Sequence, residues 1–497
     1  MKRYNLFMMT ALVGSLGYTA TAQEEKQTRP NILFCVADDA SYDHFGANGC
    51  SWVKTPNFDR VAKEGIRFTN AYTPNPKCSP SRSCIITGRN PWQLEAAANH
   101  WPVFPAKFKS VIEALRDNGY ETALTGKGWG PGDVTDNRQL IGKTYNQSSQ
   151  APTKQMSKID YAKNFRTFLD ERETDKPFFF WYGCKEPHRA YEFQSGVKKG
   201  GKRLDMLTKD DIPSYWPDTE NVRHDMLDYA FELEWCDTHL GRMLAMLEEE
   251  NMMDNTLILV TSDNGMPFPR VKGHPYQHSS HMPLVAMWKG KIVDPGRICD
   301  QFVSFTDFAP TFLEVAGISQ AKSGMKPFAG RSLIELFEGK TTVPERKYLI
   351  QGRERNDIAR PNNLGYPVRS IRVGNLFYLY NFNPELWPCG NPEAGYLDTD
   401  KSPTKTEILN RGKKSEYWQA CFDFRTQQEL YNVDKNPNCM NNLAQNPEYQ
   451  GKMAELKKQL FDRLKAEGDP YERDAFPLEL TQQDTAVWAG AFYPSVW

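Results

Sequence analysis

Residues 31–39 read Asn-Ile-Leu-Phe-Cys-Val-Ala-Asp-Asp, a continuous apolar run that ends in two carboxylates. Such a run is typical of a strand that is buried on both faces of a parallel sheet. Four similar runs follow it, at 120–125, 177–182, 256–261 and 283–288. Helical patterns lie between and after them, at 57–64, 109–117, 160–171, 220–250 and 307–316. This alternation predicts an α/β fold with a large, mostly parallel sheet flanked by helices.

The sequence pattern changes beyond about residue 345. Residues 370–380 read Ser-Ile-Arg-Val-Gly-Asn-Leu-Phe-Tyr-Leu-Tyr, which indicates a small antiparallel sheet. An amphipathic helix is expected at about 448–467. We therefore expect a first domain over residues 23–345 and a smaller C-terminal subdomain over residues 346–497.

Composition excludes some classes of partner, and the N-terminus indicates export. The chain has 61 Lys+Arg against 62 Asp+Glu, so it has no overall basic field for holding a nucleic acid. Lys2 and Arg3 precede a mostly apolar stretch at 6–18, and Ala-Thr-Ala at 20–22 offers a cleavage site. This stretch is too short to span a bilayer. We expect a signal peptide at 1–22 and a periplasmic or secreted protein without stable membrane insertion.

Polar side chains follow two of the predicted strands. Asp38 and Asp39 close the first strand, and Asp263-Asn264 closes the strand at 256–261. The carboxyl ends of parallel strands meet at one edge of a sheet, where ligands gather in open α/β folds. Three carboxylates and one amide oxygen form a hard oxygen set that suits Ca²⁺ or Mg²⁺ better than zinc. Each motif alone is also common in turns.

Residues 78–89 read Cys-Ser-Pro-Ser-Arg-Ser-Cys-Ile-Ile-Thr-Gly-Arg. Ser79-Pro80-Ser81 favours the start of a helix, so Cys78 should lie at a helix N-terminus, with Arg82 one turn further on. A cysteine in that positive field suits chemistry on anions. The alternative interpretation is a buried structural cysteine.

The same twelve residues resemble the Cys-X-Pro-Ser-Arg…Thr-Gly-Arg signature of the type I sulfatases. Segments 429–437 and 442–444 are similar to the C-terminal subdomain of that family. The resemblance implies an alkaline-phosphatase-like fold, with a catalytic domain over 23–345 and a subdomain that completes the substrate pocket. It also implies that a maturation enzyme oxidises Cys78 to formylglycine, whose hydrate is the nucleophile. Asp38, Asp39, Asp263 and Asn264, with the modified Cys78, would bind one cation, usually calcium.

Further positions match sulfatase motifs, with two departures. Residues 119–127 resemble the family segment whose lysine binds the sulfate, which assigns that role to Lys127. Trp129 stands where the family usually has a histidine. Residues 185–188 resemble His-x-Pro-His, which makes His188 the expected general acid, while Lys185 replaces the first histidine.

A basic residue about nine positions after the aspartate of Asp-Asn-Gly contacts the sulfate in this family. Lys272 has that spacing from Asp263, and Arg270 is the competing choice. Arg82, Lys127, Lys272 and the cation would then surround the oxygens of a sulfate or sulfamate group.

Within the family the chain looks most like the heparan N-sulfatases (N-sulfoglucosamine sulfohydrolases). The residues that carry this likeness lie at 187–189, 261–269, 366–371 and 381–383. The substrate would then be the N-sulfated glucosamine of heparan or heparin fragments. Bacterial relatives with the same Pro-Phe-Pro segment include O-sulfatases of other polysaccharides, so an O-sulfatase is the alternative.

Two loops are expected to contact the sugar, because they combine polar side chains with an aromatic ring. These are Asn99-His100-Trp101 and Arg353-Glu-Arg355-Asn-Asp357, and Arg369 within the segment 366–371 is a further candidate. Ordinary surface loops are the competing interpretation.

Two other functions remain open. A formylglycine phosphonate or phosphodiester hydrolase would use the same constellation, whereas a two-metal phosphatase needs histidine ligands that do not flank Asp38 or Asp263. A non-catalytic glycan-binding protein on a sulfatase scaffold is the second, and only Trp129 and Lys185 favour it.

Nine cysteines remain besides Cys78, an odd number. Cys35 and Cys184 lie in apolar runs and are expected to be buried and reduced. Cys389, Cys421 and Cys439 lie in loop-rich sequence and are the disulfide candidates, although the sequence does not pair them.

Overall fold

The computed structural model describes Met1 and residues 29–134, 136, 138–340, 344–361 and 364–470. The expected signal peptide at 1–22 lies outside this part of the chain, apart from Met1. Among the described helices, none is both long and apolar enough to cross a membrane.

The central sheet is mostly parallel, as the sequence predicts. Its strands, in spatial order, are β10 (Arg297–Cys299), β2 (Ile66–Tyr72), β9 (His281–Met287), β8 (Thr256–Ser262), β1 (Asn31–Ala37), β7 (Phe178–Gly183), β4 (Glu121–Gly126) and β6 (Lys143–Thr144), and β11 (Val303–Ser304) pairs with β2. Within this sheet β9 alone runs antiparallel to its neighbours, β2 and β8. The segment between β8 and β9 contains only the four-residue helix α7 (Gln277–Ser280), so it is no crossover helix and the chain turns back.

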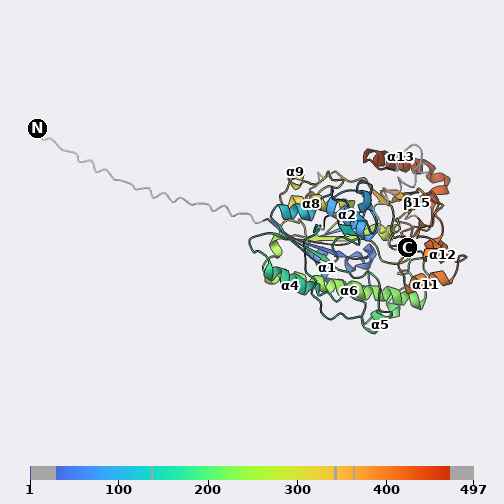
Figure 1. The fold of residues 1–497 in the computed structure, drawn as a ribbon, viewed down its shortest axis with the longest axis horizontal. Helices are drawn as coiled ribbons and strands as arrows, with labels where there is room; N and C mark the ends of the chain where they lie inside the picture. The colour runs from blue at the N-terminus through green and yellow to red at the C-terminus, as the bar shows by residue number, and fades with distance from the viewer. Residues whose placement is uncertain (2–28, 135, 137, 341–343, 362–363, 471–497) are drawn as a thin grey trace.

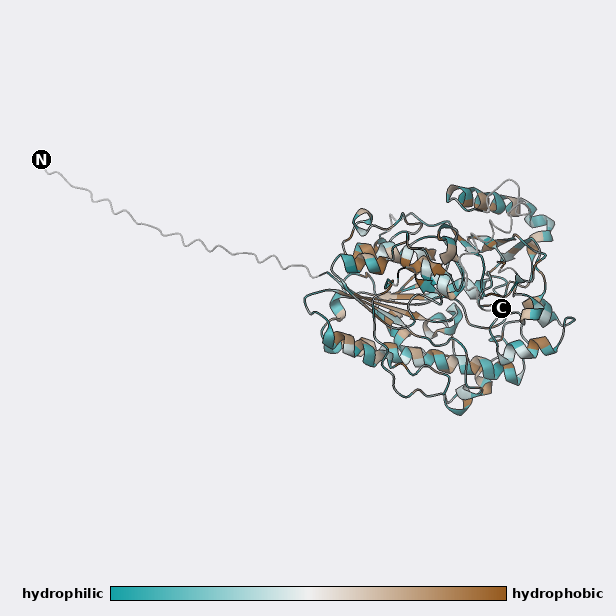
Figure 2. Cartoon of the chain, in the orientation of Figure 1, coloured by the Kyte–Doolittle hydropathy of each residue, from teal (hydrophilic) through white to brown (hydrophobic). Residues whose placement is uncertain are grey.

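Helices cover both faces of this sheet (Figure 1). One face carries α1 (Pro56–Glu64), α4 (Tyr161–Glu171) and α6 (Glu220–Glu249), and the other carries α2 (Cys78–Thr87), α3 (Val111–Asp117) and α8 (Phe308–Val315). Strand β1 divides its side chains between the two cores: Leu33 and Cys35 pack with the first group of helices, Ile32 and Phe34 with the second. Its continuous apolar run therefore reflects burial on two sides, and Figure 2 shows the apolar strands enclosed between the helices.

Capping residues fix where the helices begin. The side chain of Ser110 accepts a hydrogen bond from the backbone N–H of Glu113, and the side chain of Glu113 accepts one from the backbone N–H of Ser110. This pair is a capping box at the start of α3. Asp160 and Thr219 cap α4 and α6 with one hydrogen bond each, in which the side chain accepts from a backbone N–H of the first turn. The observed starts therefore lie within two residues of the starts expected from the sequence.

A second, antiparallel sheet lies beside the first. It contains β12 (Tyr348–Arg353), β13 (Val368–Val373), β14 (Leu376–Asn381) and β15 (Gln428–Asn432). Helix α13 (Gln450–Ala466) packs on it through Leu456, Leu460 and Leu464, which lie one turn apart on a single helix face. The small sheet and the final helix are both confirmed.

The remaining α-helices and strands are short. They are α5 (Ser195–Lys198), α9 (Gln320–Ser323), α10 (Ile334–Phe337), α11 (Pro403–Asn410), α12 (Glu416–Phe422), and the strand pair β3 (Val103–Phe104) and β5 (Asp133–Val134).

The disulfide prediction is wrong. All ten cysteines are free thiols, and nine of them are buried. The thiol of Cys389 donates to the carbonyl oxygen of Cys421 at 3.1 Å, and the thiol of Cys439 donates to that of Pro437 at 3.7 Å. Loop-rich sequence does not mean exposure here, because these loops pack inside the protein. The expectation that Cys35 and Cys184 are buried and reduced is confirmed.

Candidate active site

The ends of four parallel strands place the site. In the β1–β8 pair Ala37 is level with Ser262, so the residues that follow each strand emerge together. In the same sheet Val36 is level with Gly183 of β7, and Gly183 is level with Gly126 of β4. The segments that begin at Asp38, Asp263, Lys127 and Cys184 therefore start from one edge, as expected for an open α/β sheet.

Close backbone approach fixes the position of Lys127. Gly126 has a φ of 80°, and a Cβ at this residue would lie 2.0 Å from the carbonyl oxygen of Gly183. A Cβ at Gly183 would lie 1.8 Å from the carbonyl oxygen of Lys127. Only glycine fits at both positions, and their contact directs Lys127 over the strand ends.

Asp39 is held by its backbone as well as by its side chain. Its φ is 76°, a left-handed conformation that non-glycine residues rarely adopt. The strained backbone N–H donates to Oδ1 of Asp263 at 3.1 Å, and Oδ1 of Asp39 accepts from the amide nitrogen of Asn264 at 2.7 Å. Strain of this kind persists where surrounding contacts enforce it, which is common at functional sites.

The structure gathers a buried acidic cluster that fits a metal ion. One ligand atom each from Asp38, Asp39, Cys78 and Asp263 lies within 4.8 Å of the others, and all four residues are buried. Oδ1 of Asn264 is buried beside them and has no hydrogen-bond partner within the described residues. Carboxylate and amide oxygens are the donors that Ca²⁺ and Mg²⁺ prefer. An orphaned acceptor next to three carboxylates is the arrangement that a hard cation would satisfy.

Cys78 is the first residue of α2, and its side chain is fully buried. Its sulfur lies 3.5 Å from Oδ1 of Asp38 and 3.7 Å from Oδ1 of Asp39. Burial raises the pKa of the Cys78 thiol well above its usual value, although Lys127 and Lys272 oppose this effect. At neutral pH the unmodified side chain is therefore a neutral thiol and a poor nucleophile.

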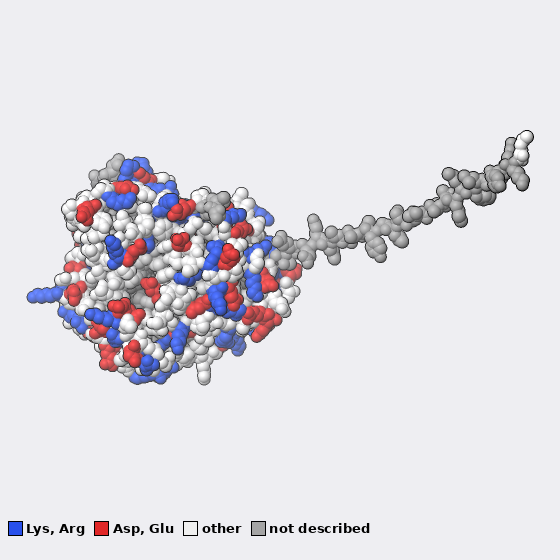
Figure 3. All heavy atoms as spheres, turned by 180° about the vertical axis from the view of Figure 1, so that it is seen from behind, with Lys and Arg blue, Asp and Glu red and all other residues white. Residues whose placement is uncertain are grey.

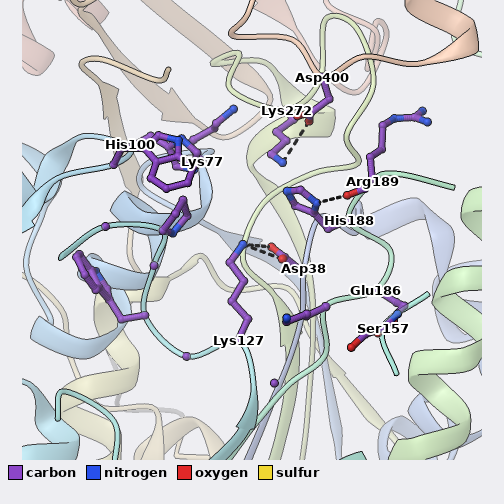
Figure 4. A pocket seen from close by; sticks show the side chains of 18 of the residues that line it. Asp38, Lys77, His100, Lys127, Ser157, Glu186, His188, Arg189, Lys272 and Asp400 are labelled. Atoms are coloured by element: carbon purple, nitrogen blue, oxygen red, sulfur yellow. Dashed lines mark hydrogen bonds and ion pairs between the residues drawn. The ribbon is translucent and has the colours of Figure 1, made fainter. Parts of the chain in front are cut away.

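Three cations surround the cluster. Arg82 donates through Nε to Oδ2 of Asp263 at 2.8 Å, Lys127 contacts both oxygens of Asp38 at 2.7 Å, and Lys272 contacts Oδ2 of Asp39 at 2.7 Å. Figure 4 shows Lys127 and Lys272 reaching the site from opposite sides. Burial raises the pKa of Asp38, but Lys127 and then His188 outweigh it and hold that pKa at about 2.

The formal charges of this group predict its ligand. Four carboxylates (Asp38, Asp39, Asp263, Asp400) and three cations (Arg82, Lys127, Lys272) sum to one negative charge. Addition of a divalent cation leaves the site with an excess of one positive charge, which favours an anionic ligand. The attraction is local, because Figure 3 shows positive and negative side chains interspersed over the face that it displays.

His188 faces the cluster from the segment after β7. Its Nδ1 lies 2.6 Å from the carbonyl oxygen of Arg189, so Nδ1 carries a proton and donates it. Its Nε2 lies 3.8 Å from Oδ2 of Asp39. The ring is partly exposed, and Nε2 can exchange a proton with a group in the pocket.

The two departures from the sulfatase motifs lie in the same pocket. The indole N–H of Trp129 donates to the hydroxyl of Ser83 at 2.8 Å, and its ring packs against Phe104. Trp129 thus supports α2 one and a half turns beyond Cys78. Lys185 is exposed and lines the pocket.

Between the two basic candidates near Asp263, the geometry favours Lys272. Arg270 is buried elsewhere and donates to the carbonyl oxygens of Ala420 and Cys439. Lys272 bridges Asp39 and Asp400, with 3.2 Å between its Nζ and Oδ2 of Asp400.

The cluster opens into a pocket of about 760 Å³. Among its walls is a group built around Asp357, which joins the two loops expected to contact the sugar and adds Lys77 to them. Lys77 contacts Oδ2 of Asp357 at 2.7 Å, and His100 and Trp101 contact Oδ1 at 2.9 and 3.2 Å. Burial lowers the pKa of His100 to about 4, so its ring is neutral. Its Nε2 has no partner within the described residues and is a free acceptor at the pocket wall.

Several pocket residues were missed, for different reasons. Lys77 directly precedes Cys78 and could have been found from that position. Asp400 and Glu232 carried no signal, because neither belongs to a motif nor closes a strand.

Three expected sugar contacts lie outside the pocket lining. Arg353 donates to the carbonyl oxygens of Gly273 and Pro388, and Arg355 donates to that of His100. Arg369 forms buried ion pairs with Glu354 and Asp469. These guanidinium groups hold loops together around the pocket, and their expected contact with the sugar stays a prediction. From the two expected loops, His100, Trp101 and Asp357 do line the pocket.

Comparison with known proteins places this geometry in a family. The sequence profile of the sulfatase family matches residues 30–318. An ulvan-active sulfatase of Formosa agariphila is 30% identical over 454 residues, which cover 89% of this chain and 81% of that protein. The N-sulphoglucosamine sulphohydrolase of Homo sapiens is 27% identical over 477 residues, covering 88% of this chain and 90% of that protein.

The fold is also found among solved structures. One, of a protein in complex with its substrate D-glucosamine-2-N,6-O-disulfate, superposes with a TM-score of 0.63 at 22% identity, covering 90% of this chain and all of that one. The architecture is the alkaline-phosphatase-like fold of the sulfatases. With a profile match over more than half of its length and relatives at this level of identity, the chain belongs to the sulfatase family of hydrolases.

Proposed function

We propose that the protein removes sulfate from a sulfated sugar, with the formylglycine form of Cys78 as the nucleophile and one Ca²⁺ in the acidic cluster. The observation that supports this most is the placement of Cys78 against Asp38 and Asp39. The raised pKa of its thiol argues against an unmodified cysteine nucleophile. The aldehyde hydrate supplies an oxygen nucleophile at this position, and the cation, held by Asp38, Asp39, Asp263 and Asn264, supplies a fixed positive charge beside it.

The residues of this chain have distinct roles in that reaction. Arg82, Lys127 and Lys272 bind the sulfate oxygens and stabilise the charge that spreads over them in the transition state. These groups are buried, where fixed charges act strongly. His188 holds a proton at Nε2 and passes it to the departing oxygen or nitrogen, while the Arg189 carbonyl keeps Nδ1 protonated.

The preferred substrate is an N-sulfoglucosamine residue of heparan or heparin fragments. The likeness to the human N-sulphoglucosamine sulphohydrolase over nearly its whole length supports it. An O-sulfatase of another polysaccharide is the second candidate, because the ulvan-active sulfatase is slightly more similar to this chain.

We propose that the two domains of the chain have different roles. Residues 23–345 carry the catalytic groups, and residues 346–497 complete the pocket through Asp357 and Asp400. Export through the signal at 1–22 and oxidation of Cys78 by a maturation enzyme complete the proposal.

The test is sulfate release from defined sulfated mono- and disaccharides, including N-sulfoglucosamine, O-sulfated glucosamines and ulvan fragments. Release from N-sulfoglucosamine alone supports the preferred substrate, and release from O-sulfated sugars alone assigns an O-sulfatase. Faster cleavage of an aryl phosphonate than of an aryl sulfate would refute the sulfatase reaction. Intact mass shows whether Cys78 has lost H₂S and gained oxygen, and an unmodified thiol in protein from the native host would favour a non-catalytic glycan-binding role.

A further inference from the structure

Glu232 is a pocket residue to which the proposed chemistry gives no role. It belongs to α6 and lines the pocket that contains Asp38 and His188. Its side chain belongs to the buried part of that helix, with 1% of the residue exposed. Oε1 has no hydrogen-bond partner within the described residues, and none of them forms an ion pair with this carboxyl group.

A buried carboxyl group with an unpartnered oxygen is costly unless a ligand satisfies it. Two neighbouring acids, Glu186 and Asp228, have the hydrogen-bond partners that Glu232 lacks. Oε1 of Glu186 accepts from the backbone of Ser157 at 2.7 Å, and its Oε2 accepts from the hydroxyl of Tyr161 at 2.7 Å. Asp228, one turn before Glu232 on α6, accepts from two backbone N–H groups. Glu232 is the buried acid of this group that lacks such partners.

The protonation state of Glu232 defines the ligand that it can take. Burial, and then the nearby Glu186 and Asp228, raise its pKa to about 9. At neutral pH it is therefore a neutral carboxylic acid, with one O–H donor and one carbonyl acceptor. A neutral acid does not repel an anionic substrate, and a sugar hydroxyl can both donate to it and accept from it.

We infer that Glu232 is a specificity-determining residue that hydrogen-bonds a hydroxyl group of the sugar carrying the sulfate. The inference rests on the proposed function, because it takes a sulfated sugar as the ligand. Glu232 on α6 would then recognise the sugar, whereas the residues at the strand ends hold the sulfate.

The test compares Glu232→Leu and Glu232→Gln with the wild type on two substrates, a sulfated monosaccharide and a sulfated phenol that has no sugar hydroxyl. For Glu232→Leu we expect kcat/KM on the sugar sulfate to fall about five- to tenfold more than on the aryl sulfate, chiefly through KM. Glu232→Gln keeps a donor and an acceptor, so its kcat/KM on the sugar sulfate relative to that on the aryl sulfate should stay close to the wild-type value. Glu249→Gln, at the exposed end of the same helix, is the control and should change neither substrate.

Deoxy sugar sulfates identify the partner. The hydroxyl that contacts Glu232 is the one whose removal from the substrate lowers kcat/KM of the wild type but does not lower kcat/KM of Glu232→Leu any further. Equal losses on the sugar and aryl sulfates would overturn the inference. So would an equal loss in Glu232→Gln and Glu232→Leu, since a substrate amine that ionises Glu232 would give that result.

Failure of the proposed function gives a different result. If the wild type releases sulfate from neither substrate, calorimetric titration of the sulfated sugar into wild type and Glu232→Leu decides. Weaker binding to the variant supports the role of Glu232, and equal affinities or no binding to either overturn it.

Discussion

The buried carboxyl group of Glu232 makes the stability of the protein depend on pH in a direction that one substitution can test. The pKa of Glu232 is raised by burial from 4.5 to about 9. Between these two pH values the unfolded chain carries an ionised carboxylate, whereas the folded protein carries the neutral acid. Folding therefore takes up a proton, and the contribution of Glu232 to stability is complete below pH 4.5 and is lost as the pH rises towards 9.

The magnitude follows from the proton count. One proton difference changes the free energy of unfolding by about 1.4 kcal/mol per pH unit at most. Between pH 5.5 and 7.5 the proton uptake of Glu232 on folding thus lowers the free energy of unfolding of the wild type by up to about 3 kcal/mol as the pH rises. Glutamine has no proton to exchange, so Glu232→Gln should gain stability relative to the wild type by this amount across the same interval.

Calorimetric unfolding of the wild type and Glu232→Gln at several pH values between 5.5 and 8.5, at fixed Ca²⁺, measures this difference. Glu249→Gln on the same helix is the matched control, because its carboxylate faces water in the folded and unfolded chain alike. A difference between Glu232→Gln and wild type that stays constant with pH would refute the reasoning, since it would mean that Glu232 is ionised in the folded protein.

Three further results are expected. Cys78→Ala should abolish sulfate release and leave the melting temperature nearly unchanged, and retained turnover would disprove its role as nucleophile. His188→Gln should slow sulfates with poor leaving groups about 10²- to 10⁴-fold and activated aryl sulfates much less, whereas equal slowing in a kinetic series would exclude it as the acid. Arg369→Ala should lower the free energy of unfolding by about 3–5 kcal/mol, because it removes the buried cation that pairs with Glu354 and Asp469, and a raised KM with unchanged stability would instead support Arg369 as a sugar contact.

Much of the fold could be predicted because it depends on local patterns. Strand β1 and the start of α6 follow from an apolar run and a capping residue, which a single segment displays. The direction of β9 could not be predicted, since an apolar run has the same composition in parallel and antiparallel pairs. That direction is decided by the connection after β8, whose loops carry no periodic signal.

The candidate site also contains residues that the sequence predicts and residues that it does not. Asp38 and Asp263 could be placed together because strand ends share an edge. Polar loop residues are commonly exposed, which favours Arg353 and Arg355 as sugar contacts, yet tertiary packing buries both. Glu232 escaped notice because a glutamate within a long helix is ordinarily solvated, and only the packing around α6 reveals that this one is not.

The rim of the pocket is shared between two sheets that have no strand in common. Asp38 and Lys127 extend from the central sheet, whereas Asp357 and Asp400 come from loops of the chain segment that forms the second sheet. We therefore expect moderate heating to misalign the rim while each sheet keeps its own ladder of hydrogen bonds. Thermal inactivation would then precede the loss of secondary structure, and a cross-link that ties the loop of Asp357 to the start of α2 would bring the two temperatures together.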